Sequence, residues 1–237
     1  MKISLIIPFR NEAAYAREAI ITVYAYLSER HIEFELIAID DSTDGTYEIL
    51  QSLAGFFPNI IVARGENPPG YGKALRKGFE IAAGEIIVPF NGDLSDSLDD
   101  LLSYIGLMEE GYDMVFGSRF MAGAEVIGQD AMKGLISRLG NRFLQWLFRT
   151  DCSDITNSFK AYRRAVLEEI EPTADGSNIV IEIALKGILG HYKYTTIPVS
   201  WSGRKYGRSK VSVIKSIPTY LGTAIRIHLF YSWRKRK

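Results

Sequence analysis

The chain has 237 residues, of which 47% are hydrophobic and 24% charged, a composition typical of one soluble globular domain and not of a disordered protein. Its single cysteine excludes a disulfide framework and a multi-cysteine zinc site, and its three scattered histidines argue against a histidine-built metal centre. The N-terminal segment MKISLIIPFRNE lacks the long apolar stretch of a signal peptide, so we expect a cytoplasmic protein.

The formal net charge of zero conceals an uneven distribution along the chain. Glu182 is the last acidic residue, and the 55 residues after it carry 12 of the 28 lysines and arginines. The first 182 residues therefore have a net charge of −12. A basic C-terminal region indicates an anionic partner such as phosphate groups, a membrane surface or nucleic acid, unless it is simply a solvated tail.

The first half of the chain alternates between short apolar runs and stretches in which apolar residues recur at helical spacing. The apolar runs predict buried strands over residues 2–8, 35–40, 60–63, 85–89 and 114–116. The helical spacing predicts helices over residues 11–30, 46–53 and 73–83. This alternation predicts an α/β fold with a doubly wound, mostly parallel sheet flanked by helices.

The second half predicts helices over residues 131–149, 178–189 and 211–231 and a strand over 192–199. The last of these helices is interrupted by charged residues and is too short to span a bilayer. We expect it to lie at a membrane surface, with packing against the core as the alternative. The expected domains are therefore a main domain over residues 1–210 and an amphipathic, basic C-terminal helix and tail over 211–237.

Polar clusters follow three of the predicted strands, at residues 10–12, 40–44 and 91–96. Ligands of doubly wound folds bind at the carboxyl ends of the strands, so these clusters mark the ligand site. Asp40 and Asp41 can accept hydrogen bonds from a base or ribose, although this segment also resembles a helix cap. Asn91–Asp96 offers the oxygen ligands that Mg²⁺ takes together with substrate phosphates, unless Ser95 or Asp96 is a helix N-cap.

The segment GYGKALRKG at residues 70–78 matches neither the G-x-G-x-x-G pattern nor the P-loop pattern. By itself it predicts a glycine-rich turn that opens a helix. The N-terminal amides of such a helix favour a nearby anion, and a tight helix start without any ligand is the alternative.

In this order, the segments resemble the family two nucleotide-sugar glycosyltransferases, which have the GT-A fold. IIPFRNE is similar to the I-P-x-x-N-E of that family, DDSTDGT to its D-D-x-S-x-D-x-T, and GYGKALRKG to its G-x-G-x-A-x-x-x-G; NGD stands where the family has a metal-binding D-x-D. FGSRF, DITNSFKAYR and IPVSWSGRKYGRSK are similar to segments of the dolichyl-phosphate mannose synthase-like polyprenyl-phosphate glycosyltransferases. The similarity extends from about residue 3 to residue 210.

The resemblance implies a role for each matching residue. For the nucleoside pocket it implies Pro8, Arg10, Glu12, Ile39 and Asp41. At the diphosphate it implies Asn91, Gly92 and Asp93. For a divalent metal, Mg²⁺ or Mn²⁺, it implies Asp93 as the main ligand, with Asn91 and Ser95 as further ligands. For catalysis it implies Asp93, Arg119, Arg204 and Lys210, with the three basic residues beside sugar or phosphate, and Asp154 is a further candidate catalytic residue.

The chain departs from the motifs at two places. Asn91 replaces the first aspartate of D-x-D, so one negative charge is missing and metal affinity is expected to fall. Asn157 and Ser158 stand where Ser-Gly is usual in D-x-T-S-G-F, which is expected to alter the sugar pocket. These departures point to an unusual donor or to weakened catalysis.

The resemblance implies an inverting transfer of a hexose from a nucleotide-diphosphate sugar, of the GDP-mannose or UDP-glucose type, to dolichyl, undecaprenyl or another polyprenyl phosphate. Such an acceptor is already ionised, whereas a hydroxyl acceptor needs a base, for which Asp154 and Glu182 are the candidates. A polysaccharide or soluble hydroxyl is thus the alternative acceptor. A non-catalytic nucleotide-sugar-binding protein is a further hypothesis, motivated by Asn91.

We expect peripheral binding at the cytoplasmic membrane face through residues 131–149 and 211–231 and the basic tail at 234–237. Related enzymes often add C-terminal membrane spans, so a separate membrane subunit is a further expected partner. The chain carries no recognisable helix-turn-helix, zinc finger or aromatic RNA platform, so we expect no nucleic acid partner.

Overall fold

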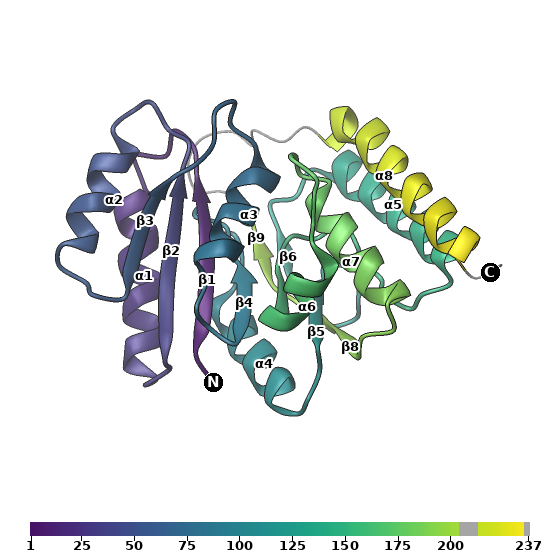
Figure 1. The fold of residues 1–237 in the computed structure, drawn as a ribbon, viewed down its shortest axis with the longest axis horizontal. Coiled ribbons are helices and arrows are strands. Elements are labelled where there is room, and N and C mark those ends of the chain that lie inside the picture. The colour runs from purple at the N-terminus through teal and green to yellow at the C-terminus, as the bar shows by residue number, and fades with distance from the viewer. Residues whose placement is uncertain (204–212, 235–237) are drawn as a thin grey trace.

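The computed structural model describes residues 1–203 and 213–234, which form a central sheet with helices on both faces (Figure 1). Within these residues the main sheet has seven strands in the order β3-β2-β1-β4-β7-β5-β8. The strands of this sheet are β1 (Ile3–Phe9), β2 (Phe34–Asp40), β3 (Ile60–Arg64), β4 (Ile86–Pro89), β5 (Met114–Ser118), β7 (Lys160–Arg163) and β8 (Tyr194–Pro198). A separate parallel pair consists of β6 (Val126–Ile127) and β9 (Trp201–Ser202).

The helices connect these strands in chain order. They are α1 (Ala16–Glu29), α2 (Thr46–Ala54), α3 (Tyr71–Ile81), α4 (Leu98–Glu109), α5 (Ala131–Phe148), α6 (Arg164–Ile170), α7 (Ile179–Leu189) and α8 (Val213–Arg234). Each predicted helix and strand is present, with the largest shift at α1, which begins at Ala16 and not at residue 11. The elements α4, α6, β6, β7 and β9 are additional.

The pairing of the strands confirms the predicted sheet, with one exception. Strands β1, β2, β3 and β4 pair in parallel and are largely apolar, as expected for strands with helices on both faces. Strand β7 runs antiparallel to both β4 and β5, and β8 then pairs in parallel with β5. The sheet is therefore doubly wound and mostly parallel, and the antiparallel β7 is the strand of this sheet that the sequence pattern did not reveal.

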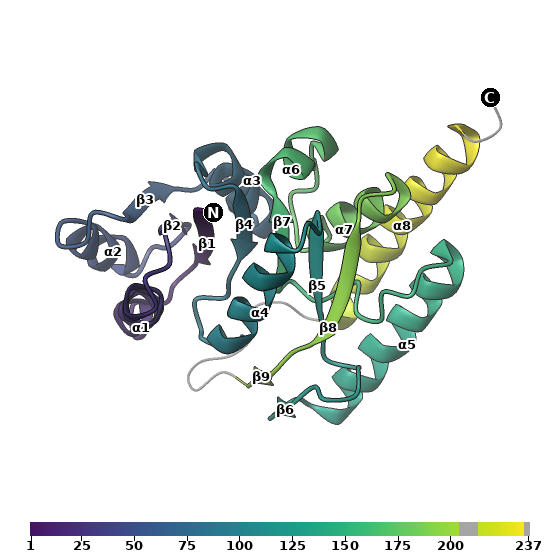
Figure 2. The ribbon, with the colours of Figure 1, turned by 90° about the horizontal axis from the view of Figure 1, so that it is seen from below.

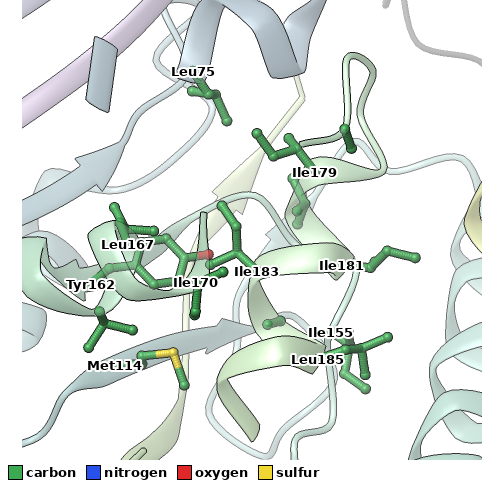
Figure 3. Close-up of a cluster of buried hydrophobic side chains, with 14 of the residues drawn as sticks. Leu75, Met114, Ile155, Tyr162, Leu167, Ile170, Ile179, Ile181, Ile183 and Leu185 are labelled. Atoms are coloured by element: carbon green, nitrogen blue, oxygen red, sulfur yellow. The ribbon is translucent and has the colours of Figure 1, made fainter. Parts of the chain in front are cut away.

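Two layers of helices bury the faces of the sheet (Figure 2). Helices α1, α2 and α4 pack on one face, and α3, α6 and α7 pack on the other. Figure 3 shows the second layer, where Met114 and Tyr162 of the sheet meet Leu167, Ile170 and Ile183 of the helices. Helix α7 is buried on nearly all sides, which explains its almost continuous apolar sequence IVIEIALKGIL.

The glycine-rich segment at residues 70–78 is explained by close packing. A Cβ atom at Gly70 would lie 2.5 Å from the carbonyl oxygen of Asp175, and one at Gly72 would overlap the carbonyl oxygen of Ala174. At Gly78 a Cβ atom would overlap the side chain of Ile6, so α3 lies directly on β1 at this residue. The tight helix start, given above as the alternative, accounts for Gly70 and Gly72 without a phosphate, and the packing of α3 on β1 accounts for Gly78.

Helices α5 and α8 lie side by side at one end of the molecule (Figure 1). Helix α8 is attached to the main body, because Ala224 and Ile227 are buried and Asn178 donates a 2.9 Å hydrogen bond to the hydroxyl of Thr223. Both helices nevertheless leave large apolar side chains exposed, which we call the α5/α8 face: Met132, Leu135, Leu139, Phe143, Trp146, Ile217, Leu221, Ile225, Leu229 and Phe230. In the described part of the chain no helix is long and apolar enough to cross a bilayer.

Candidate active site

One edge of the sheet gathers the loops that carry the polar clusters. The loops after β1, β2 and β4 lie together there because these strands are parallel neighbours. Strand β7 runs in the opposite direction, so the segment before it reaches the same edge. The topology thus brings together residues 10–12, 40–44, 91–96, 119 and 154–158, as expected for the carboxyl ends of the strands.

Side-chain hydrogen bonds join the loops after β1 and β2. The backbone N–H of Asn11 donates to Oγ of Ser42 over 2.7 Å, and Oδ1 of Asn11 accepts from the N–H of Thr43 over 2.8 Å. The N–H of Glu12 donates to Oγ1 of Thr46 over 3.0 Å. These bonds hold together the two loops that carry Arg10 and Asp41, both expected in the nucleoside pocket.

The adjacent carboxylates of Asp40 and Asp41 have different surroundings. Asp40 is buried, and its Oδ2 accepts a 2.9 Å hydrogen bond from Arg64. Asp41 is half-buried, and burial raises the pKa of its carboxyl above the ordinary value, against the opposing effect of the Arg10 guanidinium. A Cβ atom at residue 65 would overlap the Asp41 side chain, which explains Gly65. Asp41 is therefore the carboxylate of the pair that a ligand can reach.

The other residues expected in the nucleoside pocket are not equivalent. Arg10 is exposed, Pro8 is half-buried and Glu12 is buried, all at the carboxyl end of β1. Ile39 is fully buried, and its side chain belongs to the core cluster that contains Ala74. The expectation that Ile39 closes on the base and ribose stays a prediction, on a strand with helices packed on both faces.

The segment Asn91–Asp96 forms a tight turn after β4. The N–H of Ser95 donates to Oδ1 of Asp93 over 3.1 Å, which orients that carboxylate. A Cβ atom at Gly92 would lie 2.8 Å from Cε1 of Phe9, so close packing requires this glycine. The expected place of Gly92 at the diphosphate stays a prediction.

The helix that follows this turn, α4, begins after Ser97, beyond both candidate N-cap residues. Ser97 is the N-cap of α4, and its hydroxyl accepts from the N–H groups of Asp99 and Asp100. The alternative of an N-cap at Ser95 or Asp96 is therefore wrong. Both residues remain part of the turn.

Asp96 is the buried carboxyl group of the turn. Its Oδ2 accepts a 2.7 Å hydrogen bond from the amide nitrogen of Asn91, and a backbone bridge joins it to Trp201. Burial and the neighbouring charge of Asp93 raise the pKa of Asp96 to about 7. This contact of Asp96 with Asn91 was not predicted from the sequence.

Arg119 is held in place by Asp154. Nε of Arg119 lies 2.8 Å from Oδ2 of Asp154, and a second guanidinium nitrogen lies 3.1 Å from Oδ1. Asp154 is fully buried, and its Oδ1 also accepts from Asn141 over 3.2 Å and from Thr156 over 3.1 Å. The Asp154 carboxylate is thus occupied on both oxygens and orients Arg119, which follows β5 at the edge of the sheet.

A buried lysine binds the backbone of the segment that carries Asp154. Lys160 is fully buried at the start of β7, and its Nζ donates to the carbonyl oxygens of Ile155, over 2.9 Å, and Asn157. Burial lowers the pKa of Lys160 to about 8. The lysine therefore fixes the turn that carries Asp154, and neither it nor Asn141 was singled out from the sequence.

The remaining expected residues are not part of this arrangement. Arg204 and Lys210 lie outside the described residues. Glu182 lies on α7, where its carboxylate accepts from the N–H of Ala174 over 2.8 Å and from Nζ of Lys186 over 2.9 Å. Glu182 is therefore committed to holding α7 against the preceding loop.

The turn after β4 offers a few oxygen ligands and fits a divalent cation that takes its other ligands from phosphate groups. In residues 1–203 and 213–234, no cluster of three or more His, Cys, Asp or Glu side chains could hold a metal ion. Asp93 offers carboxylate oxygens at this turn, and the amide nitrogen of Asn91 faces Asp96, which leaves the amide oxygen for a cation. Mg²⁺ and Mn²⁺ are commonly bound by one or two such groups together with phosphate oxygens.

A comparison with protein families identifies the chain. The family model described as glycosyl transferase family 2 matches residues 4–171, more than half of the chain. The chain belongs to glycosyl transferase family 2. Its α/β fold is the GT-A fold, in agreement with the expectation from the motifs.

Two curated relatives and a solved structure are similar to this family 2 chain. It is 30% identical to a dolichol-phosphate mannosyltransferase of Pyrococcus furiosus over 96% of its own length and 64% of that protein. It is 27% identical to a polyprenol monophosphomannose synthase of Mycolicibacterium smegmatis over 88% of its length and 80% of that protein. The structure of glucosyl-3-phosphoglycerate synthase from Mycobacterium tuberculosis with Mn²⁺, UDP and phosphoglyceric acid has a TM-score of 0.72 at 20% identity, covering 96% of this chain and 78% of that chain.

Proposed function

We propose that this protein transfers a hexose from a nucleotide-diphosphate sugar to a polyprenyl phosphate. The names of the curated relatives support this acceptor, and the residues gathered at the carboxyl edge of the sheet support the donor. The observation that carries the proposal is the combination, at one edge, of Asp41, Asp93 and an Arg119 held by a buried aspartate.

In this proposal the donor lies along the ends of β1, β2 and β4. Asp41 accepts hydrogen bonds from the base or the ribose, with Pro8, Arg10 and Glu12 beside it. Asp93, with Asn91 and Ser95, holds Mg²⁺ or Mn²⁺ at the diphosphate. The bound metal supplies positive charge that stabilises the leaving nucleoside diphosphate.

The acceptor phosphate attacks the anomeric carbon from the opposite side, in a single inverting displacement. Arg119 faces the sugar or the acceptor phosphate, and Arg204 and Lys210 neutralise phosphate charge. The two carboxylates considered as general bases, Asp154 and Glu182, are both occupied by hydrogen bonds in the structure. This supports an acceptor that is already ionised over a hydroxyl acceptor.

The α5/α8 face supports binding at the surface of a membrane, where a polyprenyl phosphate is found. Neither α5 nor α8 contains an acidic residue, whereas Lys133, Arg138 and Arg142 are exposed on α5 and Arg226 on α8. Exposed apolar side chains among basic residues bind anionic lipid surfaces through both interactions. The cytoplasmic face and a separate membrane subunit belong to the same proposal.

Release of nucleoside diphosphate from GDP-mannose and UDP-glucose, with Mg²⁺ or Mn²⁺, tests this function. We expect release from one donor that depends on detergent-dispersed polyprenyl phosphate and is abolished by Asp93→Ala. Lipid-independent turnover would favour the hydroxyl acceptor. No turnover with any donor, but retained nucleotide binding, would favour the non-catalytic alternative that Asn91 motivates.

A further inference from the structure

We propose that Asp96 and Ser158 together orient the Asn91 amide so that its oxygen, and not its nitrogen, serves the cation and diphosphate of the donor. This inference rests on the proposed function. Asp96 and Ser158 act as positioning residues, and Asn91 is the group that they position.

The contacts of the Asn91 amide nitrogen fix its direction. Nδ2 of Asn91 lies 2.7 Å from Oδ2 of Asp96 and 3.4 Å from Oγ of Ser158. The same carboxylate oxygen is 3.4 Å from the backbone N–H of Asn91. If the amide were turned over, its oxygen would face the Asp96 oxygen, and two acceptors would lie at hydrogen-bonding distance. The nitrogen therefore faces Asp96, and the oxygen is left for the ligand.

Both acceptors are themselves held in place. Asp96 is 6% exposed, its backbone forms a bridge with Trp201, and the N–H of Ser202 donates to the carbonyl oxygen of Ser95 over 2.9 Å. Ser158 forms a further hydrogen bond with Tyr71, the first residue of α3. The two groups that accept from the Asn91 amide are thus themselves held by neighbouring residues. Such outer contacts keep a metal ligand in one orientation.

The two departures from the family motifs meet in this contact. Asn91 replaces an aspartate, and Ser158 replaces a glycine, which would have no side chain to accept from the amide. An aspartate at residue 91 would instead place a carboxylate oxygen against that of Asp96. Asn91, Ser158 and Asp96 therefore form a matched set, and Asn91→Asp alone does not restore the usual metal site.

A double-mutant cycle of Asn91→Asp, Asp96→Asn and the double variant tests the orientation without donor or metal. At pH 8 and without metal, Asn91→Asp is expected to lower Tm. The double variant is expected to recover the Tm of the wild type, because the amide at residue 96 then donates to the carboxylate at residue 91. Equal and additive effects of the two substitutions on Tm would overturn the proposal.

Binding of Mn²⁺ in the presence of GDP or UDP, followed by the EPR signal of free Mn²⁺, tests the role of the amide oxygen. Asp96→Asn is expected to weaken binding about 10- to 100-fold, as for other groups that orient metal ligands. Ser158→Ala keeps every charge and is expected to weaken it about 2- to 10-fold, the loss of one hydrogen bond. Unchanged affinity in both would overturn the proposal.

Failure of the proposed function gives a different result from failure of this inference. If the wild type binds Mn²⁺ and the two substitutions are coupled, but no sugar is transferred, the inference stands and the transferase proposal fails. If the wild type binds no Mn²⁺ with either nucleotide, the amide oxygen is no ligand and the inference fails, whatever the stability cycle shows.

Discussion

The buried carboxylate of Asp154 holds the side chain of Arg119 in place, through an ion pair with two contacts. Asp154 is fully buried and meets the guanidinium with both oxygens, at 2.8 and 3.1 Å. Two-point contact between planar groups restricts the direction of the arginine as well as its distance. Asp154 therefore acts on the reaction through Arg119, as a positioning residue.

We expect Asp154→Ala to lower the free energy of unfolding by about 3–5 kcal/mol, because it leaves the other member of a buried ion pair without its partner. Urea unfolding measures this change. Glu168→Ala, which removes the exposed Arg164–Glu168 pair, is the matched control and is expected to have a much smaller effect. Equal effects of the two substitutions would contradict the account.

Lys160 predicts a pH dependence of stability. Its pKa falls from 10.5 to about 8 on folding, so between these values the unfolded chain binds more protons than the folded protein. The free energy of unfolding that Lys160 contributes therefore rises as the pH increases above about 8. Below about pH 8 the buried lysine is charged, and the protein bears the full cost of burying that charge. The free energy of unfolding is measured for the wild type and for Lys160→Met at pH 7 and at pH 9.5. Relative to the variant, the wild type is expected to be more stable at pH 9.5 than at pH 7. The same difference at both pH values would contradict the assignment.

At the scale of elements, α3 lies so close to β1 that only a glycine fits at residue 78. Gly78→Ala is expected to destabilise the protein by about 1–3 kcal/mol, the usual cost of overpacking a core, because the new methyl group overlaps Ile6. Gly106 in α4 is a matched control, since nothing lies within 4 Å of a Cβ atom there. Gly106→Ala is expected to stabilise by about 0.5–1 kcal/mol. Thermal unfolding measures the stability of both variants. An unchanged stability of Gly78→Ala would contradict the close contact between α3 and β1.

The elements also mark where sequence reasoning succeeded. The alternation of apolar runs and helical spacing is local, so it predicted β1 to β5 and the edge of the sheet that carries both Asp41 and Asp93. Strand β7 has only four residues, KAYR, and the periodicity of so short a run is ambiguous. The contact of Asp154 with Arg119 joins residues 35 positions apart, which no local pattern encodes, and the contact of Asp96 with Asn91 lies within one turn that has no periodic pattern.

The amphipathic helices show a further limit of prediction from local sequence patterns. Their spacing correctly predicted α5 and α8, but a periodic apolar stripe does not say what covers it. Leu144 and Phe148 of α5 face the core, whereas Leu135, Leu139 and Trp146 remain exposed. Which stripe a helix buries depends on its neighbours in the fold, and only the structure contains that information.

For the whole molecule, the α5/α8 face predicts the orientation at a membrane. Trp146 is 74% exposed, so Trp146→Glu is expected to abolish sedimentation with anionic liposomes and leave the fold intact. Phe56→Glu is the matched control, because Phe56 is 78% exposed just after α2, at the other end of the molecule (Figure 1). Equal loss of binding in both variants, or in neither, would contradict this orientation.

The measurement that tests the central claim most directly is the transfer of radiolabelled hexose from GDP-mannose or UDP-glucose into an organic phase that contains polyprenyl phosphate. We expect label in the lipid product with the wild type and with Gly106→Ala, and a loss of about 100-fold or more in Arg119→Ala, the scale of removing one group that stabilises transition-state charge. Label that stays in the aqueous phase as free or polysaccharide-bound sugar would contradict the lipid acceptor. Wild-type transfer in Arg119→Ala would contradict the site.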